Sequence, residues 1–375
     1  MKTILTVAAF LISGLAFPQN KFAAFNDHKR FIELNTGICM KYFDSGNLSG
    51  PQLLLLHGYT DTSRSFQLLI EDLRRAHGDV RIIAPDLRGH GETSMPNAVP
   101  CRQVPEQCFT PRLFAEDVIN LMDQLCIDKM HIAGHSMGSI IAQELALNYP
   151  DRISSITLIG TFVNGKESEV IHDFLIRDLI ETDYRCFIEE ETNAVWPMDA
   201  YFTSPFDMGK SIQDYLKENW VVEISAAEDF LDAVFPETLQ IPLGTWIGVI
   251  KSLSKVDYRT SLEALRIPTM ILWSTQDVVT SSKDQEQVKA AFQSAAKAHG
   301  TKIFYKTYGK LPPPLPGYPL EDLGHNMHWG APKEVADDIY AFITSGRPLN
   351  NLPYANPENK KQILVDQVPN ISELK

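Results

Sequence analysis

Short, uniformly apolar runs alternate with longer amphipathic stretches along most of this chain. The run Pro51–Gly58 (PQLLLLHG) has no polar alternation, as expected for a strand buried on both faces. The stretch Leu113–Ile127 instead repeats its apolar residues at helical spacing. This alternation predicts an α/β fold, with a mostly parallel central sheet flanked by helices. The remaining strands are predicted at 80–91, 129–136, 153–161, 268–277 and 302–309, and a further helix at 282–300.

The alternation stops between about residues 163 and 258, where helical patterns dominate and no buried strand is evident. We expect 163–258 to be a helical cap, inserted between two parts of one α/β core at 17–162 and 259–346. Beyond Gly346 the composition turns polar, and residues 347–375 are predicted to form an extended C-terminal tail.

The first residues have the pattern of a targeting signal. Lys2 precedes the apolar run 4–12, and the small residues Gly14 and Ala16 fit a cleavage site after Ala16. We therefore expect residues 1–16 to be a signal peptide and the mature protein to be exported, periplasmic or secreted. The alternative is a short N-terminal core helix. No second apolar run is long enough to span a bilayer, so we expect no transmembrane segment in the mature chain.

The composition limits the possible partners. The chain carries a formal net charge of −13 at pH 7, and an acidic protein repels phosphate backbones. This argues against a nucleic-acid partner. With 44% hydrophobic residues, the chain can bury a large core, which excludes disorder throughout.

Five cysteines leave at least one unpaired. Cys101 and Cys108 bracket a short polar loop and are a candidate disulfide in an oxidising compartment. No two cysteines have C-x-x-C spacing, so no metal site built on thiolates is predicted.

The segment Gly134-His135-Ser136-Met137-Gly138 fits G-x-S-x-G between a predicted strand and a predicted helix. In that context the serine occupies a sharp, strained turn that lifts its hydroxyl clear of the sheet. Gly134 and Gly138 lack a Cβ that would collide with the neighbouring strand and helix. We therefore interpret Ser136 as a nucleophile rather than an ordinary turn residue.

A nucleophilic serine needs a base, and the base needs an orienting carboxylate. Asp277 ends one predicted strand, and His325 lies in the loop before the last predicted helix. The order Ser136, Asp277, His325 is the order expected for this architecture. His328 competes as the base, but its neighbour Trp329 and the closing helix suggest a packing role. His325 and His328 are not predicted to bind a metal ion, because no cluster of carboxylates completes a set of ligands with them.

The oxyanion formed during acyl transfer needs two backbone donors. The N–H of Met137, directly after the nucleophile, is one candidate. The N–H of Tyr59, in the loop after the first buried strand, is the other. His57 and His90 are predicted to be structural.

Six segments together resemble the α/β-hydrolase fold family with an inserted cap: HGYTDT, PDLRGHG, GHSMGS, YPDRISSITLIGT, ILWSTQD and GHNMHW. The resemblance spans roughly 51–345 and implies a serine hydrolase without a cofactor. It also implies the roles given above for Ser136, Asp277, His325, Tyr59 and Met137. A serine nucleophile in place of aspartate argues against the haloalkane dehalogenase and epoxide hydrolase branches. The proline-rich stretch 311–319 departs from the family pattern. Two roles are open for it: it forms one wall of the site, or it is a surface insertion.

The predicted cap decides the substrate. Most of its aromatic residues are expected in the cap core, with a few lining a pocket: Trp196, Phe202, Phe206, Trp220, Phe230, Phe235 and Trp246. Because no arginine cluster stands out there, we expect an uncharged, moderately apolar ester or lactone as substrate. Two alternatives remain: cleavage of a carbon–carbon or amide bond by the same triad, and a ligand-binding module with vestigial chemistry.

Overall fold

The computed structural model describes residues 22–46, 49–192, 194–220, 223, 226–308, 323–349, 354–355 and 362–363. The predicted signal peptide 1–16 and the proline-rich stretch 311–319 lie outside the described residues, as does most of the tail 347–375. Two short strands of the tail, β9 (Tyr354–Ala355) and β10 (Gln362–Ile363), pair with each other.

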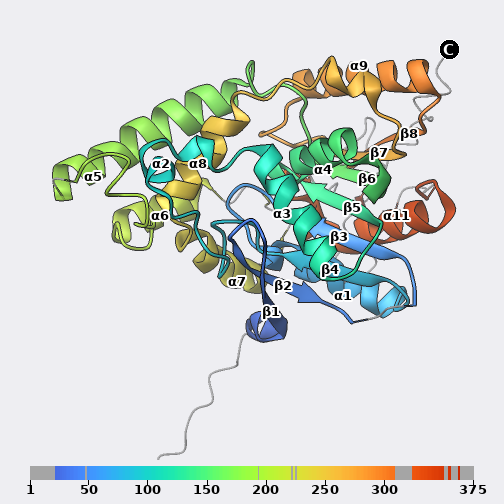
Figure 1. The fold of residues 1–375 in the computed structure, drawn as a ribbon, viewed down its shortest axis with the longest axis horizontal. Helices are drawn as coiled ribbons and strands as arrows, with labels where there is room; N and C mark the ends of the chain where they lie inside the picture. The colour runs from blue at the N-terminus through green and yellow to red at the C-terminus, as the bar shows by residue number, and fades with distance from the viewer. Residues whose placement is uncertain are drawn as a thin grey trace, which may run out of the picture.

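The described residues form an eight-stranded sheet in the order β1-β2-β4-β3-β5-β6-β7-β8 (Figure 1). Strands β3 to β8 are parallel to one another, and β1 and β2 form an antiparallel hairpin that joins β4. The predicted α/β fold with a mostly parallel sheet is confirmed, and each predicted strand is present; the hairpin was not predicted. The bounds are β1 (Lys29–Glu33), β2 (Cys39–Asp44), β3 (Gln52–Leu56), β4 (Arg81–Pro85), β5 (Met130–His135), β6 (Ile153–Ile159), β7 (Thr269–Ser274) and β8 (Ile303–Tyr308).

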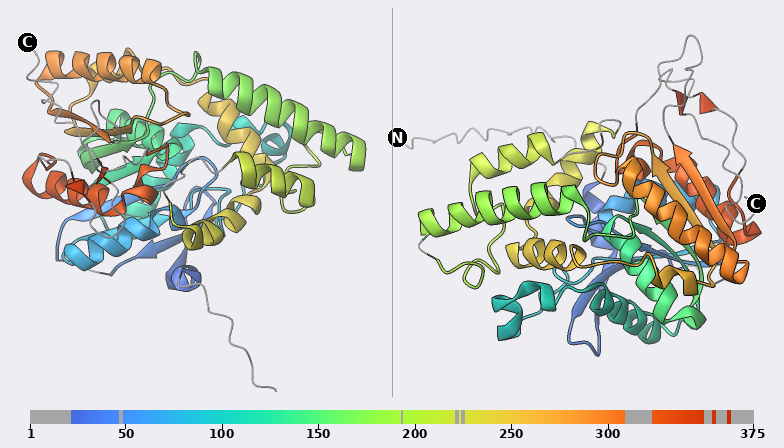
Figure 2. Two further views of the ribbon diagram at one scale, coloured as in Figure 1. Left: turned by 180° about the vertical axis from the view of Figure 1, so that it is seen from behind. Right: turned by 90° about the horizontal axis from the view of Figure 1, so that it is seen from above.

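Helices bury both faces of the sheet (Figures 1 and 2). Successive side chains of a strand point to opposite faces, and in β3 Leu54 and Leu56 join one apolar cluster while Leu53 and Leu55 join another. The first cluster takes in α3 (Pro111–Gln124), α4 (Met137–Asn148) and α9 (Ser282–His299). The second takes in α1 (Gln67–Ala76) and α11 (Pro332–Ser345). This double burial explains why β3 is apolar at every central position.

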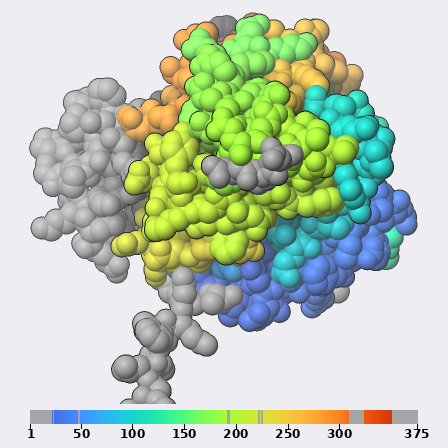
Figure 3. All heavy atoms as spheres, turned by 90° about the vertical axis from the view of Figure 1, so that its left-hand side faces the viewer, coloured from blue at the N-terminus to red at the C-terminus, as the bar shows by residue number. Residues whose placement is uncertain are grey.

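Residues 163–258, here called the helical segment, connect β6 to β7. Its helices lie beside the sheet and form much of one side of the molecule (Figures 1 and 3). Trp246 and Phe230 are fully buried, as expected, but Phe202 and Phe206 are exposed. The helices are η5 (Val170–Tyr184), α5 (Arg185–Thr192), α6 (Lys210–Asn219), α7 (Glu228–Leu239) and α8 (Leu243–Leu253).

The remaining elements are short turns of helix: η1 (Ala23–His28), η2 (Ser63–Phe66), α2 (Val99–Gln103), η3 (Pro105–Gln107), η4 (Pro150–Arg152), η6 (Ser261–Ala264) and α10 (Met327–Gly330). A disulfide joins Cys101 in α2 to Cys108 after η3, and Cys39, Cys126 and Cys186 are free thiols. Within the described ranges, no helix has the length and apolar character to cross a membrane.

Candidate active site

Ser136 occupies the turn between β5 and α4. Its backbone has φ 50° and ψ −117°, a conformation that residues with a side chain rarely adopt. Among the described residues, Cys126 is the one other non-glycine residue with a positive φ. Such strain persists where the surroundings enforce it and is common at functional sites. The turn leaves Ser136 in the wall of a cavity, and its hydroxyl makes no hydrogen bond to a described residue.

The two glycines of this turn are sterically required. A Cβ on Gly134 would lie 2.2 Å from the carbonyl oxygen of Gly138. A Cβ on Gly138 would lie 2.0 Å from the carbonyl oxygen of Leu56 in the adjacent strand β3. Both contacts are with backbone atoms, which cannot rotate away, so the sheet and α4 can approach this closely at glycine alone.

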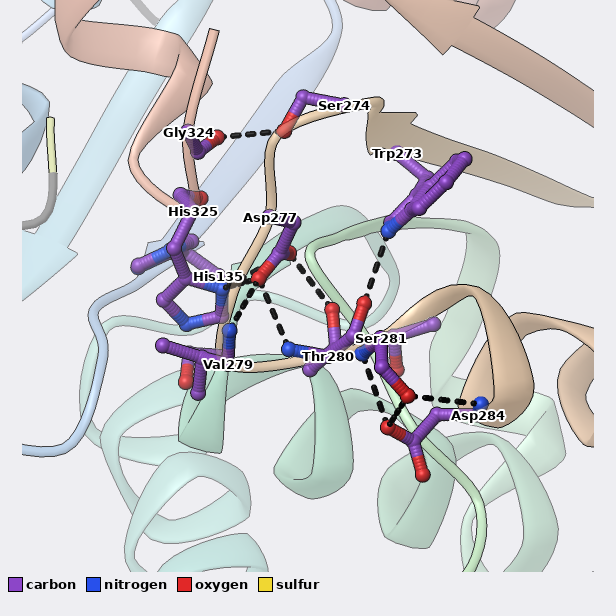
Figure 4. A network of polar contacts seen from close by, with 12 residues as sticks. His135, Trp273, Ser274, Asp277, Val279, Thr280, Ser281, Asp284, Gly324 and His325 are labelled. Atoms are coloured by element: carbon purple, nitrogen blue, oxygen red, sulfur yellow. Dashed lines mark hydrogen bonds and ion pairs between the residues drawn. The ribbon is translucent and has the colours of Figure 1, made fainter. Parts of the chain in front are cut away.

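Asp277 is paired with His325 (Figure 4), and His325 lines the same cavity as Ser136. Nδ1 of His325 lies 3.0 and 2.9 Å from the two carboxylate oxygens of Asp277, just beyond the end of β7. The N–H groups of Val279 and Thr280 donate to one of these oxygens, each at 2.8 Å, and the Thr280 hydroxyl donates to the other at 2.6 Å. Asp277 is thereby held in one orientation.

The surroundings of Asp277 favour its charged form. Burial raises the pKa of this carboxyl, but His325 and the hydrogen bonds from Thr280 outweigh burial and bring the pKa below its usual value. An ionised Asp277 accepts a hydrogen bond from the Nδ1–H of His325, which leaves Nε2 free to accept a proton. His325 and Ser136 both line the cavity, without a hydrogen bond between them; such contacts commonly tighten when substrate binds.

The backbone around His325 is fixed from three sides. The carbonyl of Gly324 accepts a hydrogen bond from the Ser274 hydroxyl at the end of β7, at 2.5 Å (Figure 4). The N–H of Gly324 donates to the Glu223 carboxylate of the helical segment at 2.9 Å. The carbonyl of His325 accepts from Nε2 of His135, which precedes the serine, at 3.1 Å.

The predicted oxyanion donors follow two neighbouring strands. Leu56 of β3 pairs with Gly134 of β5, so Tyr59 and Met137 come soon after the carboxyl ends of adjacent parallel strands. Neither backbone N–H donates to an acceptor among the described residues. Met137 is also the first residue of α4, where the helix dipole favours negative charge.

The other predicted histidines lie nearby in structural settings. His57 donates from Nδ1 to the carbonyl of Gly58 and accepts the N–H of Leu87 at Nε2. Burial lowers the pKa of His57 to about 3, which keeps the ring neutral. His328 is fully buried, and its Nε2 lies 3.0 Å from the Ser65 hydroxyl. His90 contacts the carbonyls of Arg88 and Tyr59.

Sequence reasoning missed one polar pair in the cavity wall. Oδ2 of Asp61 lies 3.7 Å from Nδ1 of His135, and both residues line the cavity. Burial raises the pKa of Asp61, but His135, together with His57 and the Ser65 hydroxyl, outweighs burial and the pKa is lowered. Asp61 belongs to the HGYTDT segment and His135 to the G-x-S-x-G motif, so both residues lie in segments that the sequence analysis singled out. The spacing within each segment does not indicate that the two side chains lie close together.

The cavity measures about 320 Å³ and is largely apolar. Its apolar walls come mainly from the helical segment and include Phe174, Leu175, Trp220, Phe235, Ile250 and Leu253. Among the described residues, no lysine or arginine lines it, and none of the His, Cys, Asp and Glu side chains form a group of three that could hold a metal ion. Phe202 and Phe206 do not belong to the lining.

A family model described as "alpha/beta hydrolase fold" matches residues 51–180. Human epoxide hydrolase 4 is 23% identical over 327 residues, covering 82% of this chain and 76% of the relative. Lipase 1 of Psychrobacter immobilis is 22% identical over 311 residues, covering 83% and 82%. The solved structure of an enol-lactonase from Burkholderia xenovorans superposes with a TM-score of 0.56 at 18% identity, covering 84% of this chain and all of that one.

Proposed function

Because the chain is a hydrolase of the α/β-hydrolase fold superfamily, we propose that it cleaves carboxylic esters or lactones through Ser136, His325 and Asp277. One observation carries the proposal: the Ser136 hydroxyl stands at a strained turn, free of hydrogen bonds to described residues, in a cavity that His325, the partner of Asp277, also lines.

The proposed reaction follows from this arrangement. Nε2 of His325 takes the proton of Ser136 as its oxygen attacks the carbonyl carbon. The oxyanion that forms is stabilised by the N–H groups of Tyr59 and Met137. His325 then protonates the departing alcohol, which leaves an acyl-enzyme. Water, deprotonated by His325, attacks the acyl group and releases the acid and the free serine.

The cavity favours an uncharged, moderately apolar substrate. The walls contributed by the helical segment are aliphatic and aromatic, which suits an apolar acyl or alcohol group. A strongly anionic substrate would meet the carboxylate of Asp61 without a lysine or arginine from the described lining to balance it. In this proposal the helical segment is the cap that sets specificity.

Epoxide hydrolysis, the activity named for several relatives, is less compatible with a serine at this turn. Attack of a serine oxygen on an epoxide carbon would give an ether, which has no carbonyl for water to attack. The covalent intermediate would therefore not turn over. Attack on an ester or lactone gives an acyl-enzyme that does turn over.

Ester turnover by the wild type and by Ser136→Ala tests the proposal. We expect the wild type to hydrolyse short p-nitrophenyl esters or lactones and to be labelled by a fluorophosphonate, and Ser136→Ala to do neither. Equal turnover by both proteins would contradict the assignment of Ser136. A panel of diketones and aminoacyl anilides separates carbon–carbon and amide cleavage from ester cleavage, and a wild type that stays unlabelled indicates a binding module.

We further propose that the protein is exported. The pattern of residues 1–16 supports this, and so does the Cys101–Cys108 disulfide, since such bonds persist in oxidising compartments. Mass analysis of the protein from a secreting host tests it. A mature chain that begins at Phe17 supports export, and an intact chain retained in the cytosol contradicts it.

A further inference from the structure

The loop that follows β3 is bound to three helices of the helical segment. The phenol of Tyr59 donates to the carbonyl of Trp246 in α8 at 2.5 Å. The indole N–H of Trp220, at the end of α6, donates to the Thr60 hydroxyl at 2.7 Å. These contacts join residues that are 187 and 160 positions apart in the chain.

The third contact is ionic. The carboxylate of Glu237 in α7 accepts hydrogen bonds at 2.5 Å from Arg64 Nε and from the Thr62 hydroxyl. Arg64 is buried, and the Glu237 carboxylate supplies the counter-charge that its guanidinium needs there. The segment Tyr59–Arg64 is here called the β3 loop. It makes one hydrogen bond to α8, one to the residue that ends α6, and an ion pair and a further hydrogen bond to α7.

Tyr59 connects the proposed oxyanion donor to the helical segment. Its backbone N–H is the proposed oxyanion donor, and its carbonyl accepts from Nε2 of His90 at 2.7 Å. Its ring packs edge-to-face against Trp246 and Trp220, with centroids 5.5 and 6.1 Å apart. Burial raises the pKa of the phenol, so the group stays protonated and remains a donor.

We infer that the Tyr59 phenol is a positioning group: through the carbonyl of Trp246 it fixes the β3 loop so that the Tyr59 N–H points at the developing oxyanion. This inference rests on the proposed function, because it gives the N–H a catalytic role. The helical segment then contributes to the chemical step as well as to specificity. An N–H aimed at the oxyanion contributes more in the transition state than in the ground state, so its misplacement lowers kcat rather than raising KM.

Tyr59→Phe tests the inference, because it keeps the ring and the backbone N–H and removes the hydroxyl alone. Tyr201→Phe is the matched control. Tyr201 is also buried and lies in the helical segment, and its phenol also donates to a backbone carbonyl of the core, that of Pro96, at 2.8 Å. It is not among the residues that line the cavity. Both variants lose one hydrogen bond from a buried tyrosine to a backbone carbonyl, but only Tyr59→Phe loosens the β3 loop.

We expect kcat for a p-nitrophenyl ester to fall about three- to tenfold in Tyr59→Phe, the loss expected for one neutral hydrogen bond. KM should stay within about twofold. Inhibition by a trifluoromethyl ketone, which forms a tetrahedral adduct with the serine, should weaken by the same factor as kcat falls. Tyr201→Phe should keep the wild-type kcat and inhibition constant, even if its melting temperature drops as much as that of Tyr59→Phe.

Wild-type kcat and inhibition in Tyr59→Phe would overturn the inference, and so would an equal loss of kcat in Tyr201→Phe. If Tyr59→Phe does not fold, Thr60→Val removes the acceptor of Trp220 in the same loop and should give the same pattern. A wild type that neither turns over esters nor reacts with a fluorophosphonate refutes the proposed function as well. Active, labelled wild type with unchanged variants refutes the positioning role alone.

Discussion

Nδ1 of His325 lies within 3.0 Å of both carboxylate oxygens of Asp277, which is held in turn by three hydrogen bonds from the two residues Val279 and Thr280. The histidine is therefore oriented by a carboxylate that cannot itself rotate. The first prediction follows from this pair.

Asp277→Asn should lower kcat for ester hydrolysis on the order of 10³- to 10⁴-fold, while the melting temperature changes little. An amide in this place no longer selects the tautomer with its proton on Nδ1, so Nε2 of His325 stops acting as the acceptor. Steady-state kinetics at saturating ester measure the effect. Asp123→Asn, which alters an exposed ion pair with Arg152, is the control and should be fully active. A loss of less than tenfold in Asp277→Asn would argue against the orienting role.

Gly138→Ala should destabilise the protein by about 3 kcal/mol or more and abolish activity, because the new Cβ would lie 2.0 Å from the Leu56 carbonyl oxygen. Urea unfolding and ester turnover measure the two effects. Gly300→Ala is the control: Gly300 has φ +65° and ψ 22°, in the left-handed region, and among the described residues no atom beyond its chain neighbours lies within 4 Å of the position that a Cβ would take, so only the backbone conformation opposes the substitution. That control should lose about 1–2 kcal/mol and keep its activity. Equal losses in the two variants would show that steric contact at Gly138 is not the cause.

His131 should make the free energy of unfolding depend on pH between about 4 and 6.5. Burial, helped by Lys129, lowers the pKa of His131 to about 4 in the folded protein. Below pH 6.5 the unfolded chain binds a proton there that the folded protein does not, so stability falls as the pH falls. The loss of unfolding free energy due to His131 approaches about 1.4 kcal/mol for each pH unit between these values, and it stops growing below pH 4.

His131→Gln should therefore reduce the slope of the unfolding free energy against pH between pH 6.5 and 4 by up to about 1.4 kcal/mol per pH unit, as measured by urea denaturation at several pH values. Part of the slope remains, because burial also lowers the pKa of His57. His172→Gln, at an exposed position, is the control and should keep the wild-type slope. Parallel curves for His131→Gln and the wild type would contradict the prediction.

Glu237→Gln should destabilise the protein by about 3 kcal/mol, because it leaves the buried guanidinium of Arg64 without its counter-charge. Thermal or urea unfolding measures the loss. Asp214→Asn breaks an exposed ion pair with Lys210 in the same helical segment and should change stability by no more than about 0.5 kcal/mol. Similar effects in both variants would mean that burial of the Arg64–Glu237 pair does not matter.

The sequence was informative where the signal is local. The parallel strands are continuous apolar runs, and the helix predicted to begin at Ser282 does begin there, behind a capping box of Ser281 and Asp284. The G-x-S-x-G spacing, between a predicted strand and a predicted helix, identified the turn that the structure shows at Ser136. In each case the physical cause of the local structure lies in residues that are close together in the sequence.

Features that depend on distant partners could not be predicted. The hairpin strands β1 and β2 each contain a lysine, and the sequence analysis did not predict them. Lys29 is in fact buried against Asp86, 57 residues away, and Arg81 pairs with Asp44. The Asp61–His135 pair and the bond from Tyr59 to Trp246 likewise join residues with no pattern in common. Such contacts follow from the three-dimensional arrangement of the elements, which local periodicity does not specify.

The three hydrogen bonds around Gly324 and His325 have a consequence for how this fold can vary. They come from the end of β7, from the turn at Ser136 and from the helical segment, three parts of the chain that are far apart in the sequence. The base is thus aligned by the same elements that carry Ser136, follow β7 with Asp277 and form the cavity wall. A substitution in any of these three elements therefore acts on the position of the base as well as on its own surroundings.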